Sequence, residues 1–172
     1  MDSDEIFAPI SQYTTICSII TVSSSYGQNL HQMNVNTTFL HRSLKEEVYV
    51  EQPKRFEVQY WKKHVFKLKK ALYRLKQAPR AWYERINNYL MNLGFTRSEV
   101  DMNLYFKVEN DRPLILVLYV YDLFMTGVSP LIHQCKRELA SEFEMKDLGL
   151  MHYFLGLELW QKPSEIFLSQ EK

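Results

Sequence analysis

The residue with the clearest chemical potential is Asp122, which lies in the stretch LYVYDLFMTG at residues 118–127. The apolar run at 114–117 precedes it and is typical of a strand buried on both faces. The carboxylate is therefore predicted where a buried strand ends, with Gly127 marking a turn beyond it. An aspartate in this position is typical of a turn start, and it is also a residue that binds divalent metal ions. Both interpretations are open from this stretch, and so is the question of whether Tyr121 stands where a further acid would complete such a site.

Basic and aromatic residues are concentrated between Lys54 and Arg85. This basic block holds eleven Lys and Arg against two acids, whereas the rest of the chain holds ten basic and eighteen acidic residues. Aromatic residues are interleaved with the charges, at Tyr60, Trp61, Phe66, Tyr73, Trp82 and Tyr83. Such a pattern suits phosphate neutralisation combined with base stacking. A solvated helix face above core aromatics would have the same composition, so nucleic-acid binding and a structural role are both open here.

Length and composition limit the class of protein. With 172 residues, 46% hydrophobic and 24% charged, the chain is long enough for one globular domain with a sizeable core. It has no run of eighteen apolar residues, and its acidic start, MDSDEIF, is unlike a signal peptide. Cys17 and Cys135 fit no metal-ligand spacing. These features predict an intracellular protein, cytoplasmic or nuclear, with reduced thiols and no membrane contact.

The hydrophobic patterns predict a mixture of helices and strands that would position Asp122. Helices are expected at 12–26, 37–44, 79–93 and 129–143, and strands at 30–35, 47–51, 64–68, 104–108, 114–120, 153–159 and 165–169. The helix at 79–93 is the clearest, because Pro79 suits its first turn and Gly94 follows its end. This order predicts the α+β class, with an antiparallel sheet and packed helices.

Six stretches, taken in chain order, resemble the reverse transcriptase of copia-type retrotransposons, the RNA-dependent DNA polymerase of their Pol polyproteins. They read APISQYTTICSII, LHQMNVNTTFL, EEVYVEQP, VFKLKKALYRLKQAPRAWY, LYVYDLFMTG and FEMKDLGLMHYFLGLEL, and together span about residues 7–171. The resemblance implies a polymerase palm with part of the fingers. Residues 1–172 would form one partial domain, with thumb, ribonuclease H and integrase absent. The implied partners are an RNA or DNA template-primer, bound weakly and without sequence preference, and deoxynucleotides.

The same resemblance places the family's three metal-binding aspartates at Asn34, Tyr121 and Asp122. The family reads QMDV and YVDD where this chain reads QMNV and YVYD. The family's acids hold two Mg²⁺ ions, so that the primer hydroxyl attacks the nucleotide's α-phosphate. An amide removes one charge, and a phenol stays protonated at neutral pH. With only Asp122 left as a vestigial ligand, the chain is predicted to bind Mg²⁺ weakly and to be a catalytically inactive pseudoenzyme.

The resemblance also implies substrate contacts. Gln77 matches a position near the incoming nucleotide's sugar, and Arg80 is expected near its phosphates or the template. Tyr153, with Gly156, matches the region that grips the primer strand. The nucleic-acid contacts expected in the basic block are Lys69, Lys70 and Lys76. Simpler interpretations remain open for two of these residues, because Arg80 suits a solvated first helical turn and Tyr153 suits an ordinary strand.

Glycine is scarce, at 5 of 172 residues against roughly 7% in average proteins. The family has glycine in three turns where this chain has Arg42, Arg55 and Arg74, and glycine there supplies positive φ without steric cost. With the missing acids, these losses indicate a degenerate copy. Three alternatives stay open. They are a working polymerase in which Glu158 or Asp101 substitutes, a non-catalytic nucleic-acid-binding protein, and a relic without function.

Overall fold

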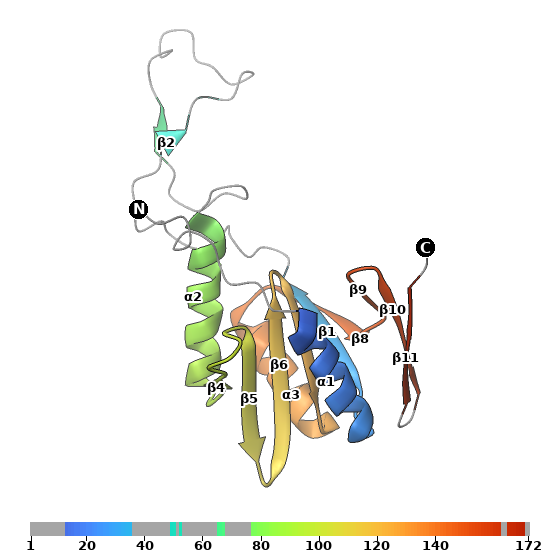
Figure 1. Cartoon of the computed structure of the whole chain (residues 1–172). Helices are drawn as coiled ribbons and strands as arrows, with labels where there is room; N and C mark the ends of the chain where they lie inside the picture. Colours follow the sequence, from blue (N-terminus) through green and yellow to red (C-terminus); the bar gives the residue numbers. More distant parts are fainter. Residues whose placement is uncertain are drawn as a thin grey trace.

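A six-stranded antiparallel sheet forms the centre of the protein (Figure 1). The computed structural model describes residues 13–35, 49–50, 52, 65–67, 77–162 and 165–170. The sheet order is β4-β5-β6-β7-β1-β8. Its strands are β1 (Leu30–Val35), β4 (Thr96–Arg97), β5 (Leu104–Glu109), β6 (Arg112–Tyr119), β7 (Asp122–Gly127) and β8 (Met145–Leu150). The predicted α+β class with an antiparallel sheet is confirmed.

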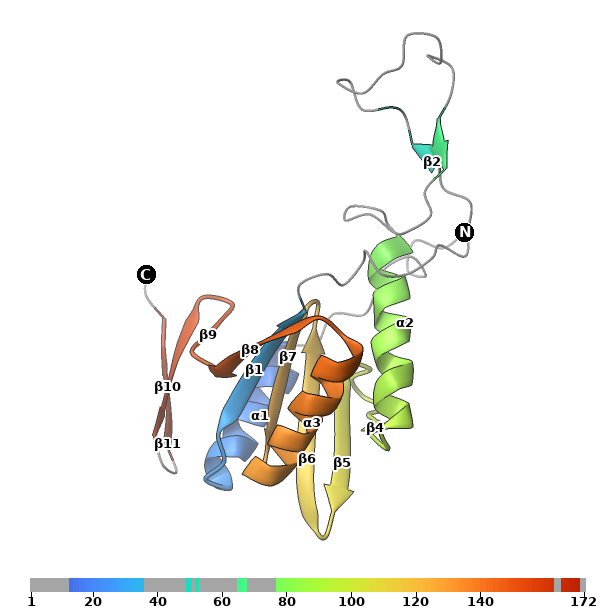
Figure 2. The ribbon, with the colours of Figure 1, turned by 180° about the vertical axis from the view of Figure 1, so that it is seen from behind.

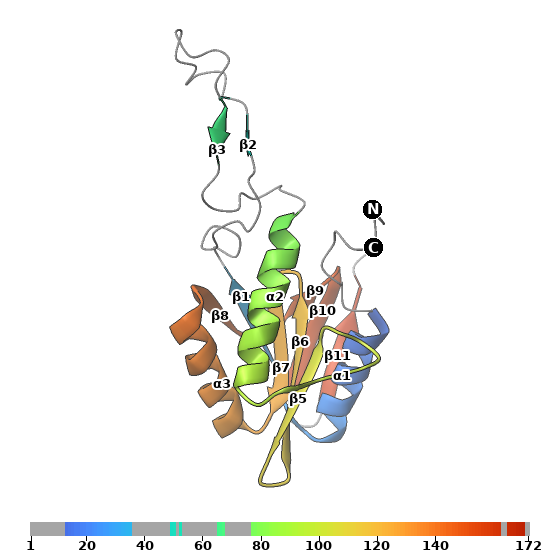
Figure 3. The ribbon, with the colours of Figure 1, turned by 90° about the vertical axis from the view of Figure 1, so that its left-hand side faces the viewer.

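Three helices in the described part of the chain pack on this sheet: α1 (Tyr13–Ser25), α2 (Gln77–Asn92) and α3 (Ser129–Glu142). In Figure 3, α3 and α1 lie on opposite sides of the sheet, and Figure 2 shows α2 on the same side as α3. No helix among the described residues is long and apolar enough to cross a membrane.

The sheet is buried on both faces, and each face has its own core. One core joins α2 and α3 to the sheet through residues such as Ile86, Leu139 and Leu123. The other joins α1 to the opposite face through residues such as Ile19 and Phe124. Successive residues of β7 point to opposite faces, so Leu123 and Phe124 belong to different cores. The apolar run at 114–117 correctly predicted a strand buried on both sides.

Two smaller sheets complete the described structure. One consists of β9 (Tyr153–Phe154), β10 (Leu157–Lys162) and β11 (Glu165–Ser169), in the order β11-β10-β9. The other pairs β2 (Tyr49–Val50) with β3 (Phe66–Lys67). The Gln161 side chain ties the three-stranded sheet to β1, because it accepts the Leu30 N–H at 2.8 Å and donates to the Leu30 carbonyl at 3.0 Å.

Strands β7 and β8 are absent from the sequence prediction, which placed only a turn after Asp122. The prediction failed at β7 because the turn before it, Val120-Tyr121, contains no residue that marks a turn in sequence. It failed at β8 because this strand forms the sheet edge and carries the polar residues Lys146 and Asp147 instead of an alternating pattern.

The single strand predicted at 153–159 is wrong. Leu155 and Gly156 have φ values of 46° and 79° and form a two-residue turn, so β9 and β10 pair with each other. Only Gly156 hints at this turn, because leucine rarely adopts positive φ. The predicted helix at 37–44 and the three arginines at glycine positions, Arg42, Arg55 and Arg74, lie outside the described residues.

Candidate functional site

The β6–β7 hairpin carries two of the three predicted acid positions. Tyr119 pairs with Asp122, so Val120 and Tyr121 form the turn. Val120 has φ of 53°, which is an outlier for a β-branched residue and stores strain. The turn is held from two sides, since the Trp82 indole N–H donates to the Val120 carbonyl at 3.0 Å and the Val35 N–H donates to the Tyr121 carbonyl at 3.0 Å.

The third predicted acid position lies directly opposite on β1. Asn34 pairs with Asp122 across the antiparallel strands, and its Nδ2 donates to Asp122 Oδ1 at 3.1 Å. The structure therefore brings Asn34 and Asp122 into direct contact, and Tyr121 precedes Asp122 in the turn, with its side chain packed against the α2–α3 core. They occupy the same end of two neighbouring strands.

A residue that sequence reasoning missed, Gln32, completes this cluster. Its Nε2 donates to the same Asp122 Oδ1 at 3.0 Å. Gln32 precedes Asn34 by two residues and therefore shares its face of β1, which is the only signal in the sequence that points to it. Asp122 Oδ1 is thus an acceptor for two amide groups, which compensate part of its charge.

The donor set at this cluster does not fit a pair of divalent ions. Asp122 supplies one carboxylate, Asn34 and Gln32 present amide N–H groups to it, and Tyr121 packs half-buried against the α2–α3 core. Hard divalent cations require several anionic or carbonyl oxygens. Among the residues that the structure describes, no group of three or more His, Cys, Asp or Glu side chains converges.

Neither proposed substitute acid joins the cluster. The Asp101 carboxylate accepts the Thr15 hydroxyl at 2.6 Å and the Asn103 N–H at 2.9 Å, so it fastens α1 to the loop before β5. Glu158 accepts the Tyr153 hydroxyl at 2.9 Å, within the three-stranded sheet. Both carboxylates have partners of their own.

The β9–β10 hairpin packs beside the cluster. Phe154 makes edge-to-face contacts with Tyr119 and Phe124, with ring centroids 5.1 and 5.0 Å apart. Because Tyr119 pairs with Asp122, this aromatic contact places the hairpin next to the acid positions. Tyr153 points the other way and is 65% exposed, so its ring is accessible for contact.

The remaining predicted site residues are less well placed. Arg80 is exposed in the first turn of α2, where its Nε lies 3.4 Å from Glu84 Oε1, as expected for a solvated helical residue. Gln77 is the first residue of α2. The three predicted lysine contacts, Lys69, Lys70 and Lys76, lie outside the described residues.

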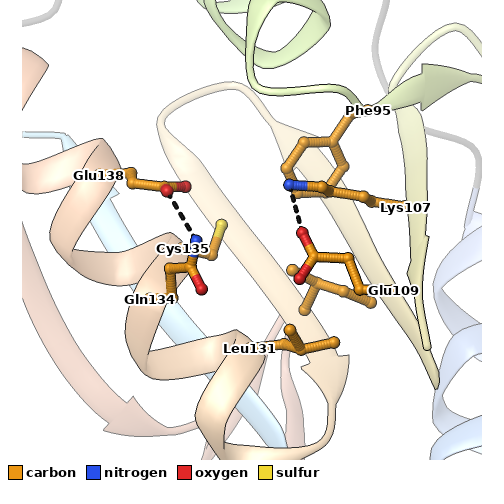
Figure 4. Close-up of a pocket in the computed structure, with 8 residues that line it drawn as sticks. Phe95, Lys107, Glu109, Leu131, Gln134, Cys135 and Glu138 are labelled. Carbon is orange, nitrogen blue, oxygen red and sulfur yellow. Dashed lines mark hydrogen bonds and ion pairs between the residues drawn. The ribbon is translucent and has the colours of Figure 1, made fainter.

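A small cavity between α3 and β5 is too small to be a substrate site (Figure 4). Its volume is about 10 Å³, room for no more than one water molecule. Burial, assisted by the charge of Glu138, raises the pKa of the Cys135 thiol to about 12, so this cysteine is unreactive. Lys107 and Glu109 also line the cavity, and they form an ion pair with 2.6 Å between Lys107 Nζ and Glu109 Oε1.

An ion pair between α3 and β8 has a structural role. Lys136 of α3 lies 2.6 Å from Asp147 Oδ1 and 3.3 Å from His31 Nδ1, and so joins α3 to β8 and β1. Burial and the Lys136 charge lower the pKa of His31. Burial acts to raise the pKa of Asp147, but hydrogen bonds from Lys136 and the Gly149 N–H outweigh it and lower that pKa.

Comparison with known proteins identifies the family. All of residues 1–172 match the family described as reverse transcriptase (RNA-dependent DNA polymerase). The chain belongs to the reverse transcriptase family. It is 39% identical over 176 residues to the retrovirus-related Pol polyprotein from transposon TNT 1-94 of Nicotiana tabacum, and 37% over 173 residues to that from transposon RE1 of Arabidopsis thaliana. The predicted resemblance to copia-type reverse transcriptases is confirmed.

This reverse transcriptase chain corresponds to a small part of those relatives. It is covered completely in both alignments but spans only 13% and 12% of the two polyproteins. It is also 42% identical over 133 residues, or 77% of its length, to the putative transposon Ty5-1 protein of Saccharomyces cerevisiae, of which 43% is covered. No solved structure shows significant similarity to it. Reverse transcriptases generally use Mg²⁺, and the family implies a nucleic-acid template and nucleotides as partners.

Proposed function

We propose that this chain is the palm and part of the fingers of a copia-type reverse transcriptase domain that no longer catalyses polymerisation. The observation that carries this proposal is the hydrogen bonding of Asp122, whose Oδ1 accepts amide N–H groups from Asn34 and Gln32. Carboxylates would face one another here in a two-metal polymerase site. In this chain, amide donors face the one carboxylate that is left.

The physical reason for inactivity is the loss of negative charge. Replacement of two carboxylates by an amide and a phenol removes two of three charges from the position where the metal ions of the family would bind. One half-buried carboxylate with backbone oxygens is a site for weak calcium binding at most. We therefore expect Mg²⁺ to bind no more tightly than the millimolar range.

A second function, non-catalytic nucleic-acid binding, has a separate basis. The basic block at 54–85 carries a net charge of +9, and aromatic residues are interleaved with its charges. Neither feature depends on the missing acids. We expect weak binding to RNA and DNA that is independent of sequence and falls steeply with salt. A chain that binds neither metal nor nucleic acid would instead be a relic without function.

Divalent-metal binding tests the first proposal. Mn²⁺ is titrated into the parent chain and into the Asn34→Asp/Tyr121→Asp variant, with free Mn²⁺ measured by electron paramagnetic resonance. We expect no saturable site tighter than millimolar in the parent, and tighter binding in the variant that Asp122→Asn abolishes. A micromolar site in the parent that disappears in Asp122→Asn would overturn the proposal.

A further inference from the structure

The outward face of the three-stranded sheet is a second surface with a definite pattern. In Figure 1 this sheet lies at the edge of the molecule, beside α1. Along β10 and β11, alternate residues point inward, and Leu159, at 1% exposure, is buried against α1 with Ile16 and Ile19. The register of the strands places the other set on one outward face: Tyr153, Glu158, Trp160, Lys162, Glu165, Phe167 and Ser169.

This outward face exposes an unusual amount of aromatic surface. Trp160 and Phe167 are cross-strand partners and are 58% and 48% exposed, and Tyr153 on the neighbouring strand is 65% exposed. Contiguous apolar surface of this kind marks an interaction site or a tendency to associate. Isolated exposed apolar residues would carry no such meaning, but these three rings share one face of one small sheet.

The charges on the outward face distinguish between possible partners. Lys162 is positive, and Glu158 and Glu165 are negative, so the face has a net charge of −1. A surface that binds a phosphate backbone needs an excess of positive charge. The Lys162 ammonium lies 5.1 Å from the centre of the Phe167 ring, next to the exposed aromatic surface. The face therefore fits a protein partner of mixed charge better than a nucleic acid.

The order of charges makes the outward face complementary to itself. On β10, Trp160 lies between Glu158 and Lys162, and on β11 Phe167 lies beyond Glu165. Consider a two-fold axis that lies between the two packed faces. If this axis runs perpendicular to the strands at Trp160, it brings Lys162 of each copy to Glu158 of the other. A two-fold axis parallel to the strands would stack Trp160 on Phe167 and bring Lys162 to Glu165. Both symmetric arrangements bury the aromatic rings and pair every lysine with a glutamate.

We propose that this face packs against the same face of a second copy of the chain, as a weak two-fold dimer. Two sheets packed face to face lie about 10 Å apart, which aromatic side chains from both copies would fill. The face comprises only three short strands, so the interface is smaller than a standard stable one and the dimer is expected to be transient. The proposal is independent of polymerase function.

Sedimentation velocity over a concentration series tests the proposal on the full chain. We expect the weight-average mass to rise with concentration from 20.6 kDa toward twice that value. Trp160→Ser should weaken association roughly tenfold or more, because buried tryptophan commonly dominates an interface. Phe106→Ser is the matched control, since Phe106 is also a partly exposed strand aromatic, at 40%, but lies on β5 of the other sheet.

Charge reversal gives an independent test that does not depend on the aromatic core. Lys162→Glu should weaken association. A second substitution should restore it: Glu158→Lys if the two-fold axis runs across the strands, and Glu165→Lys if the axis runs parallel to them. A chain that stays monomeric over the whole series, or association unaffected by both Trp160→Ser and Lys162→Glu, would overturn the proposal. Loss of single-stranded oligonucleotide binding in Trp160→Ser, without a change in mass, would also overturn it and assign the face to nucleic acid.

Discussion

Restoring one acid alone, by Asn34→Asp, should destabilise the protein. The Asn34 amide donates to Asp122 Oδ1 at 3.1 Å, and a hydrogen bond to a charged group contributes about 1.5–3 kcal/mol. The new carboxylate would also face Asp122 across the strands. Two unit charges about 4 Å apart repel by about 1 kcal/mol in water and about 4 kcal/mol at an effective dielectric constant near 20. Because both side chains are half-buried, we expect a total loss of about 3–5 kcal/mol.

The matched control is Asn34→Ala, which removes the hydrogen bond without adding charge. Urea denaturation of the parent and both variants, in chelator at pH 7.5, measures the free energy of unfolding of each. We expect Asn34→Asp to be less stable than Asn34→Ala by the free energy of repulsion between the new carboxylate and Asp122. This difference should narrow toward pH 4, where two facing carboxylates can share a proton. Equal stability of the two variants at pH 7.5, with no change on acidification, would refute the reasoning.

Three further predictions concern other parts of the chain. Val120→Gly should raise the free energy of unfolding by about 0.5–1 kcal/mol, because glycine adopts the φ of 53° without strain, and an unchanged urea midpoint would count against this. Burial and the Lys136 charge lower the pKa of His31, so its contribution to stability is complete above about pH 6.5 and is lost as pH falls through the lowered value. His31→Gln should therefore flatten the decline in melting temperature between pH 7.5 and 5.5. An unchanged decline would mean that titratable groups other than His31 cause it. Replacement of Lys69, Lys70, Lys76 and Arg80 by Ala should weaken oligonucleotide binding and reduce its salt dependence in fluorescence anisotropy, and an unchanged salt slope would mean that the basic block is only a solvated face.

Regular periodic patterns were the part of the fold that could be predicted from sequence. The helix near 79–93 was recognised from its apolar face and its terminal Pro79 and Gly94, and the buried run at 114–117 from its continuous apolar residues. Strand β8 could not be predicted, because its place is fixed by pairing with β1 and by the Lys136–Asp147 contact. Such long-range interactions leave no local periodicity.

The candidate site was predictable only in part, for a similar reason. Motif resemblance predicted Asn34, Tyr121 and Asp122 as site residues, and the strand register places Asn34 opposite Asp122, directly after the turn that contains Tyr121. The role of Gln32 could not be derived from the sequence, because a glutamine on a strand has no intrinsic preference for a particular carboxylate. Its contact with Asp122 depends on the register between β1 and β7, 90 residues apart in the chain.

Primer extension tests the central claim most directly, which is that the substitutions at Asn34 and Tyr121 have silenced the polymerase site. The parent chain is incubated with a template-primer, labelled deoxynucleotides and either Mg²⁺ or Mn²⁺, beside a no-protein control and the Asp122→Ala variant. We predict that the parent incorporates no label above the no-protein control with either metal. Incorporation by the parent that Asp122→Ala abolishes would contradict the account.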